Sequence, residues 1–110
     1  MVWSLRGGSS FARVRESGRS GRAPHVTVKV LCLHDGLPVR LGMAVSRQVG
    51  NAVHRNLLRR RLRVIIAEIS EQLFGMIVTI RLLSGAAEVS YADLRRNVRT
   101  ALHHAQVPLS

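Results

Sequence analysis

The sequence predicts a two-layer α+β domain in which the elements follow the order helix, strands, helix, strand, helix. Three observations lead to this fold class. Residues 26–33 alternate between apolar and polar side chains, residues 51–73 carry apolar side chains at helical spacing, and residues 76–83 form a β-branched apolar run. A chain of 110 residues can bury one core, so we expect residues 1–110 to form a single domain.

The N-terminal part of the chain is expected to contain one short helix. Residues 1–9 mix Gly, Ser and Arg, and we expect them to be flexible. A helix over residues 11–17 follows, and Gly18 ends it. The next segment, residues 18–25, is basic and rich in Gly and Ser, which indicates a loop or at most a short edge strand.

The middle of the chain predicts an antiparallel hairpin. Residues 26–33 form its first strand and residues 39–47 its return strand, with the turn signal Asp35-Gly36 between them. The valines at even positions of the first strand face the core, whereas the alternate side chains, starting with Thr27, face the other way. Small residues on one side of the return strand leave room for a neighbour, so this face of the hairpin is expected to be open.

The long central helix is expected to begin at Asn51, a favourable N-cap, and to run to about Leu73. One apolar stripe along it consists of Leu58, Leu62, Ile65, Ile66, Ile69 and Leu73. Residues 76–83 then read as a buried strand. Ser90 is expected to cap the last helix, with Asp93 as its partner in a short capping box.

Positive charge is concentrated in one part of the chain. The 17 Lys and Arg residues outnumber 6 Asp and Glu residues, and the formal net charge is +11. Seven arginines fall between Arg40 and Arg63, while no acidic residue stands between Asp35 and Glu68. We therefore expect these arginines to face a polyanionic partner, and nucleic acid is the class that fits best.

No arrangement of residues in the sequence is typical of a catalytic or metal site. The acidic residues are scattered, and the adjacent His103 and His104 would point apart on a helix. A single cysteine, Cys32, excludes an internal disulfide and a cysteine-based zinc site. No apolar run is long enough to span a membrane or resembles a signal peptide, so we expect a cytoplasmic protein without membrane contact.

The Gly50-Asn51 turn and the helix that follows combine several devices for binding phosphate. The first turn of a helix has free backbone N–H groups and a positive dipole end, which attract an anion. The arginines after Asn51 extend that positive surface along the helix. A charged helix face is often only solvated, but the absence of neighbouring acidic residues favours phosphate binding here.

The same stretch resembles the signature of the bacterial ribonuclease P protein component. The matching residues are Arg40, Gly42, Val45, Ser46, Arg47, Gly50, Asn51, Ala52, Val53, Arg55, Asn56, Arg59, Arg60 and Arg63. Outside this stretch, Phe11, Val14 and Gly18 resemble the first helix of that family, and residues 90–94 resemble the start of its last helix.

The resemblance implies a four-stranded sheet packed against helices, with a rare left-handed crossover through the basic segment. It also implies a function. The chain would be the protein subunit of a ribonucleoprotein endoribonuclease, in which the catalytic RNA and Mg²⁺ remove the 5′ leader from precursor tRNA. No catalytic residue and no metal ligand would then come from the protein, which we expect to be monomeric without RNA.

The resemblance assigns two binding surfaces. The surface for the catalytic RNA would consist of Arg40, Ser46, Arg47, Gln48, Asn51, Arg55, Asn56, Arg59, Arg60 and Arg63. The cleft for the leader would consist of Phe11, Arg15, Thr27, Lys29 and Leu31.

Several residues depart from the family pattern. Leu57 and Gln48 replace usual basic residues, Ser10 replaces an acidic one, and Arg15 and Lys29 replace aromatic residues of the cleft. Leader binding is therefore expected to depend more on charge than on base stacking.

Two other classes of protein remain as alternatives. One is a ribosomal or other structural RNA-binding protein of similar fold. The other is a helix-turn-helix regulator of DNA. A strand directly before the basic helix argues against this regulator, because the motif needs two packed helices.

Overall fold

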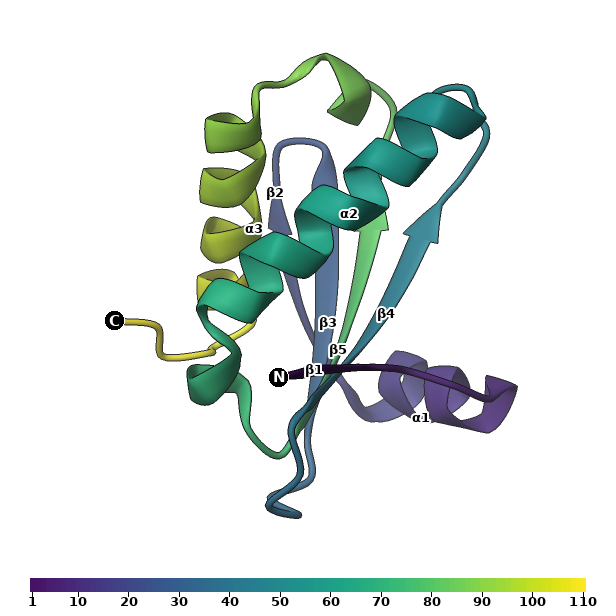
Figure 1. Ribbon diagram of the computed structural model, residues 1–110. Helices are drawn as coiled ribbons and strands as arrows, with labels where there is room; N and C mark the ends of the chain where they lie inside the picture. Colours follow the sequence, from purple (N-terminus) through teal and green to yellow (C-terminus); the bar gives the residue numbers. More distant parts are fainter.

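The computed structural model describes residues 1–110 as one sheet with helices on both faces (Figure 1). The strands are β1 (Val2–Ser4), β2 (Arg19–Ala23), β3 (Val26–Cys32), β4 (Val39–Val45) and β5 (Met76–Leu82). The helices are α1 (Gly8–Ser17), α2 (Ala52–Glu68) and α3 (Tyr91–His104), with short 3₁₀ helices at Ser70–Leu73 and Ala86–Glu88. The α+β class and the order of the main elements are thus confirmed.

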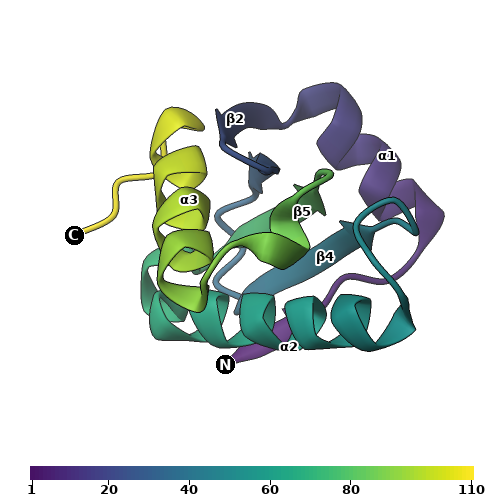
Figure 2. The ribbon, with the colours of Figure 1, turned by 90° about the horizontal axis from the view of Figure 1, so that it is seen from above.

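The helices are divided between the two faces of the sheet (Figure 2). The strand order is β1-β4-β5-β3-β2. α2 lies across one face, α1 lies on the opposite side, and α3 packs mainly on β2 and β3. The chain therefore leaves the outer surface of α2 free, and it leaves part of the sheet uncovered beside α1.

The connection from β4 through α2 to β5 is a left-handed crossover. β4 and β5 are parallel neighbours. When both strands point upward with α2 in front, the chain passes from β4 on the right to β5 on the left (Figure 1). Most connections of this type are right-handed, so the rare handedness implied by the family resemblance is confirmed.

The core lies between the sheet and the pair α2 and α3. All six residues of the predicted α2 stripe are buried, each at most 3% exposed. The even-numbered valines of β3 meet them from the sheet, and each is at most 1% exposed. Burying a large aliphatic side chain stabilises a fold by about 1.5–3 kcal/mol, so this stripe fixes α2 firmly on the sheet.

The predicted hairpin of β3 and β4 is wrong. β5 lies between the two strands and pairs antiparallel with β3 and parallel with β4. A strand with apolar residues on both faces, as in β5, gains most from a central position, where both of its edges are also hydrogen-bonded. The Asp35-Gly36 turn is a local signal, and it cannot exclude a distant strand from entering between its two arms.

The N-terminal segment also differs from the prediction. Residues 2–4, expected to be flexible, form β1 and pair parallel with β4, and the Leu5 N–H continues the pairing to the Leu41 carbonyl at 2.9 Å. The sheet therefore has five strands rather than four. The added strand satisfies the backbone groups along the edge of β4, which would otherwise be open.

The segment after α1 forms the edge strand β2, the second of the two predicted alternatives. It pairs antiparallel with β3, and α3 lies directly on it. A Cβ atom at Gly21 would lie 1.8 Å from the Ala101 carbonyl oxygen. Glycine is therefore required here for the close approach of α3 to the sheet.

The predicted N-caps Asn51 and Ser90 are present, but the Asp93 carboxylate accepts from Arg96 and does not complete the capping box. The Asn51 side chain accepts the His54 N–H at 2.9 Å, and the Ser90 hydroxyl accepts the Asp93 N–H at 3.1 Å. α2 ends at Glu68, and the predicted continuation to Leu73 is a separate 3₁₀ turn. No helix combines the length and apolar character needed to cross a membrane.

Candidate nucleic-acid interface

One surface of α2 carries arginines without acidic partners. We call Arg55, Asn56, Arg59, Arg60 and Arg63 the basic face of α2. The three ion pairs of the structure join Arg40 to Asp35, Arg95 to Glu68 and Arg96 to Asp93. None involves the basic face, whose one internal contact is a 3.4 Å hydrogen bond from Arg59 to Asn56. Its positive charge is therefore not neutralised within the protein.

The turn before α2 adds to this surface. Ser46, Arg47 and Gln48 are exposed, whereas Val49 is 6% exposed and anchors the turn in the core. The Val49 N–H donates to the Ser46 carbonyl at 3.1 Å, which bends the chain tightly into the helix. This turn and the first turn of α2 lie together at the end of β4 (Figure 1). The exposed residues of the turn therefore lie next to the free N–H groups of the helix.

Within this surface, the Arg55 side chain is only partly exposed. Its Nε atom is buried and has no hydrogen-bond partner. The Arg55 stem is thus packed against the protein in the first turn of α2, beside the free N–H groups there.

Arg40, predicted as part of this surface, is the one of these arginines that forms an ion pair. It stands near the beginning of β4, and the rise along a strand separates it from Ser46 by roughly 20 Å. Its guanidinium binds Asp35 at 2.7 and 3.3 Å, and its side chain is 12% exposed. The hydrogen bond from Arg40 lowers the pKa of Asp35 below its usual value. Arg40 therefore has an acidic partner within the chain, and its predicted contact with RNA stays a prediction.

A cleft of about 250 Å³ opens on the other face of the sheet, beside α1. Four of the predicted cleft residues line it, namely Phe11, Arg15, Thr27 and Lys29. A Cβ atom at Gly42 would lie 2.7 Å from the Phe11 ring. The small residues of β4 thus leave space for the Phe11 ring of α1, as the sequence predicted for a neighbour on this face. Leu31, predicted for the same cleft, does not line it.

Two cleft residues on β5 were missed from the sequence. Thr79 pairs with Lys29 of β3 and with Gly42 of β4. Arg81 likewise pairs with Thr27 of β3 and with a residue of β4. Both line the cleft, because the central position of β5 places its alternate side chains on this face. The signal was the two polar residues at alternate positions within an otherwise apolar run, but only the strand order could connect them with the cleft.

The charged side chains that line the cleft are all basic. Arg15, Lys29 and Arg81 all line it, and no acidic side chain does. The Lys29 ammonium donates to the Arg15 carbonyl at 3.2 Å, which ties β3 to α1 across the cleft. The cleft therefore offers three cations and the 37% exposed ring of Phe11 to a ligand.

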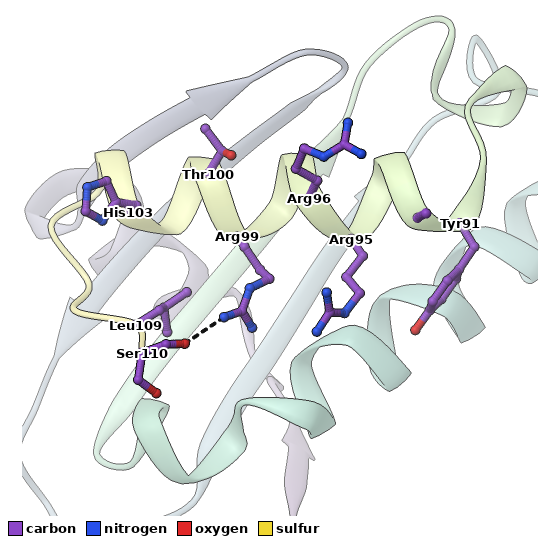
Figure 3. Close-up of a pocket in the computed structure, with 9 residues that line it drawn as sticks. Tyr91, Arg95, Arg96, Arg99, Thr100, His103, Leu109 and Ser110 are labelled. Carbon is purple, nitrogen blue, oxygen red and sulfur yellow. Dashed lines mark hydrogen bonds between the residues drawn. The ribbon is translucent and has the colours of Figure 1, made fainter.

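A third region lies on the outer side of α3, where a groove of about 640 Å³ is lined by none of the predicted residues (Figure 3). Glu68 of α2 accepts hydrogen bonds there from Arg95 at 2.7 Å and from the Tyr91 hydroxyl at 3.2 Å. The bond from Arg95 lowers the pKa of Glu68, while desolvation together with Glu68 raises the pKa of Tyr91. Nowhere do three His, Cys, Asp or Glu side chains gather in a way that could hold a metal ion.

Comparisons with known proteins agree with one another. A family model described as ribonuclease P matches residues 2–106. The ribonuclease P protein component of Kocuria rhizophila is 39% identical over 99 residues, which cover 89% of this chain and 87% of that protein. The component of Thermus thermophilus is 38% identical over 99 residues, which cover 90% of this chain and 57% of that protein.

Solved structures share the fold. The RNase P protein of Staphylococcus aureus gives a TM-score of 0.86 at 21% identity over 96% of both chains. That of Thermotoga maritima gives 0.79 at 21% identity over 96% of this chain and 98% of the other.

Proposed function

Because the chain belongs to the family of bacterial ribonuclease P protein components, we propose that the basic face of α2 binds the catalytic RNA and that the cleft beside α1 holds the 5′ leader of precursor tRNA. Family membership makes the chain the protein subunit of a ribonucleoprotein endoribonuclease. The alternative of a ribosomal or other structural RNA-binding protein is not favoured by the family match. The two binding surfaces and their division of work are our proposal.

The observation that carries the first half of the proposal is the uncompensated charge of the basic face. Its four arginines have no acidic partner, and they extend from a helix N-terminus that itself attracts anions. Arginine binds phosphate through two parallel hydrogen bonds, which positions an RNA backbone as well as neutralising it. A folded RNA with closely spaced phosphates is the partner that this surface suits.

The second half of the proposal uses the chemistry of the cleft. Arg15, Lys29 and Arg81 can neutralise phosphates of a single strand, and Phe11 can stack on one base. Three cations and a single aromatic side chain favour the backbone over the bases. We therefore expect leader binding to be strongly salt-dependent and only weakly selective for sequence.

We attribute the hydrolysis itself to the RNA subunit with its bound Mg²⁺, and only binding and orientation to this chain. By neutralising phosphates, the basic face would also stabilise the folded RNA and so lower the Mg²⁺ concentration that the RNA needs. By holding the leader, the cleft would raise the affinity for precursor tRNA over mature tRNA. We further propose that this takes place in the cytoplasm.

Reconstitution tests the proposal most directly. The purified protein is added to the RNA subunit of the same organism at low Mg²⁺, and removal of the leader from precursor tRNA is measured. Stimulation of cleavage is the expected result. An RNA subunit that processes the substrate equally well with and without the protein would overturn the proposal.

A further inference from the structure

The outer side of α3 carries a second positive surface that neither proposed contact uses. Arg95, Arg99 and His103 follow one another at four-residue spacing, so they form one row along α3 with a rise of about 6 Å between neighbours. Arg95 and Arg99 project from α3 into the groove beside α2 (Figure 3). We call these three residues the α3 row.

The groove is positively charged even though its arginines are partly paired. Glu68 accepts the hydrogen bond from Arg95 at 2.7 Å and also feels the charge of Arg99, while Arg61 of α2 acts on the neighbouring Tyr91. Two arginines thus act on one carboxylate, and a third acts on the tyrosine bonded to it. Arg99 makes one side-chain hydrogen bond, from Nη2 to the Ser110 carbonyl at 2.9 Å, and the rest of its guanidinium is available to a ligand.

We propose that the α3 row binds phosphates of the catalytic RNA as a second contact, separate from the basic face of α2. This inference rests on the proposed binding of that RNA by α2. Arg61 of α2 acts electrostatically on Tyr91 in the first turn of α3, so the positive charge of α2 reaches the neighbouring helix. α2 and α3 also contact each other, so one RNA that rests on α2 can extend onto α3.

The composition of the groove favours RNA over a protein partner. The centre of a protein interface is usually depleted of charged residues and built around apolar anchors, whereas nucleic-acid interfaces are polar and positive. Here Arg95, Arg96, Arg99 and His103 line the groove, and no acidic side chain does. The regular spacing of the α3 row also matches a ligand with a repeating negative charge.

A tethered cleavage reagent can locate the groove on the RNA. Cys32 is the one cysteine of the chain, so a Cys32→Ser background allows a single label at Ala92→Cys, which lines the groove, or at Val53→Cys, which is 74% exposed on the first turn of α2. Each labelled protein is bound to the catalytic RNA alone, and the cleaved nucleotides are mapped.

The inference expects RNA cleavage from both labels, at different RNA segments. Cleavage from the Val53 position alone would overturn the second contact and leave the proposed function intact. Cleavage from neither position would contradict the proposed function, and the inference would fail with it.

A charge-removal variant tests the same contact by affinity. Arg95→Gln with Arg99→Gln should weaken binding of the catalytic RNA roughly tenfold at about 0.1 M salt, and it should reduce the slope of log affinity against log salt by about 1.4–1.8. The Lys substitutions at the same two positions should restore most of the slope. The matched control, Arg6→Gln with Arg13→Gln, removes two exposed arginines on the α1 side.

The control variant is expected to change the slope much less. Equal changes in the two variants would mean a general effect of net charge and would overturn the inference. Thermal unfolding of each variant shows whether the fold is kept, and the labelled Ala92 position gives an answer even if the double Gln variant is unstable.

Discussion

Replacement of Arg59 and Arg63 by Ala should weaken binding of the catalytic RNA and make it less sensitive to salt. Each arginine lies on the basic face of α2 without an acidic partner, so each is expected to neutralise one phosphate. Every neutralised phosphate contributes about 0.7–0.9 to the slope of log affinity against log salt. Loss of two contacts should therefore reduce that slope by about 1.4–1.8.

The same slope gives the expected change in affinity. Between 50 and 200 mM salt, the affinity difference between the wild-type and double-variant proteins should shrink roughly tenfold, because the wild-type protein loses more with added salt. The fold itself should hardly change. Arg59 makes one weak hydrogen bond at 3.4 Å, Arg63 is exposed, and Ala is the most favourable residue inside a helix.

The assay is a titration of labelled catalytic RNA at four or more salt concentrations, with a melting curve for each protein. Arg6→Ala with Arg13→Ala serves as the matched control, because it removes the same charge from the α1 side of the molecule. Parallel lines for the wild-type and the Arg59→Ala, Arg63→Ala protein would refute direct phosphate contact by the basic face.

Three other changes separate the parts of the molecule. Lys29→Ala should weaken binding of tRNA with a leader more than of mature tRNA, and equal losses would remove Lys29 from the leader cleft. Gly42→Ala should displace the Phe11 ring, because the new Cβ would lie 2.7 Å from it. Leader binding should then weaken by up to the roughly 1–3 kcal/mol typical of a stacked base, while the affinity for the catalytic RNA stays the same. An unchanged preference for tRNA with a leader would contradict this. Arg40→Ala should leave the RNA salt slope unchanged but alter acid unfolding. Because Arg40 lowers the pKa of Asp35 from its usual value of 3.8, the pair stabilises the fold at pH values above 3.8. This stabilisation is lost as the pH falls through the lowered pKa, so the variant should lack that part of the pH dependence. Identical acid-unfolding curves for the two proteins would refute the role of the pair.

Much of the fold follows from local patterns. The apolar stripe of α2, the caps at Asn51 and Ser90, and the alternation of β3 depend on residues a few positions apart, and helix and strand periodicity converts such spacings directly into faces. The basic face of α2 was predictable for the same reason, since residues on one helix keep a fixed relation to one another. The four predicted residues that line the cleft lie on α1 and β3, two elements that local patterns predicted.

By itself, then, the sequence determined the helices, most of the strands, the charge of α2 and, through its resemblance to a known family, the class of partner. Only the tertiary structure decided which strands are neighbours: it placed β5 between β3 and β4, and it added β1 at the edge. Those choices brought Arg81 into the cleft, while Arg40 is paired with Asp35 near the start of β4. The physical reason is that strand order depends on burial and hydrogen bonding between segments distant in the chain, which no local pattern records.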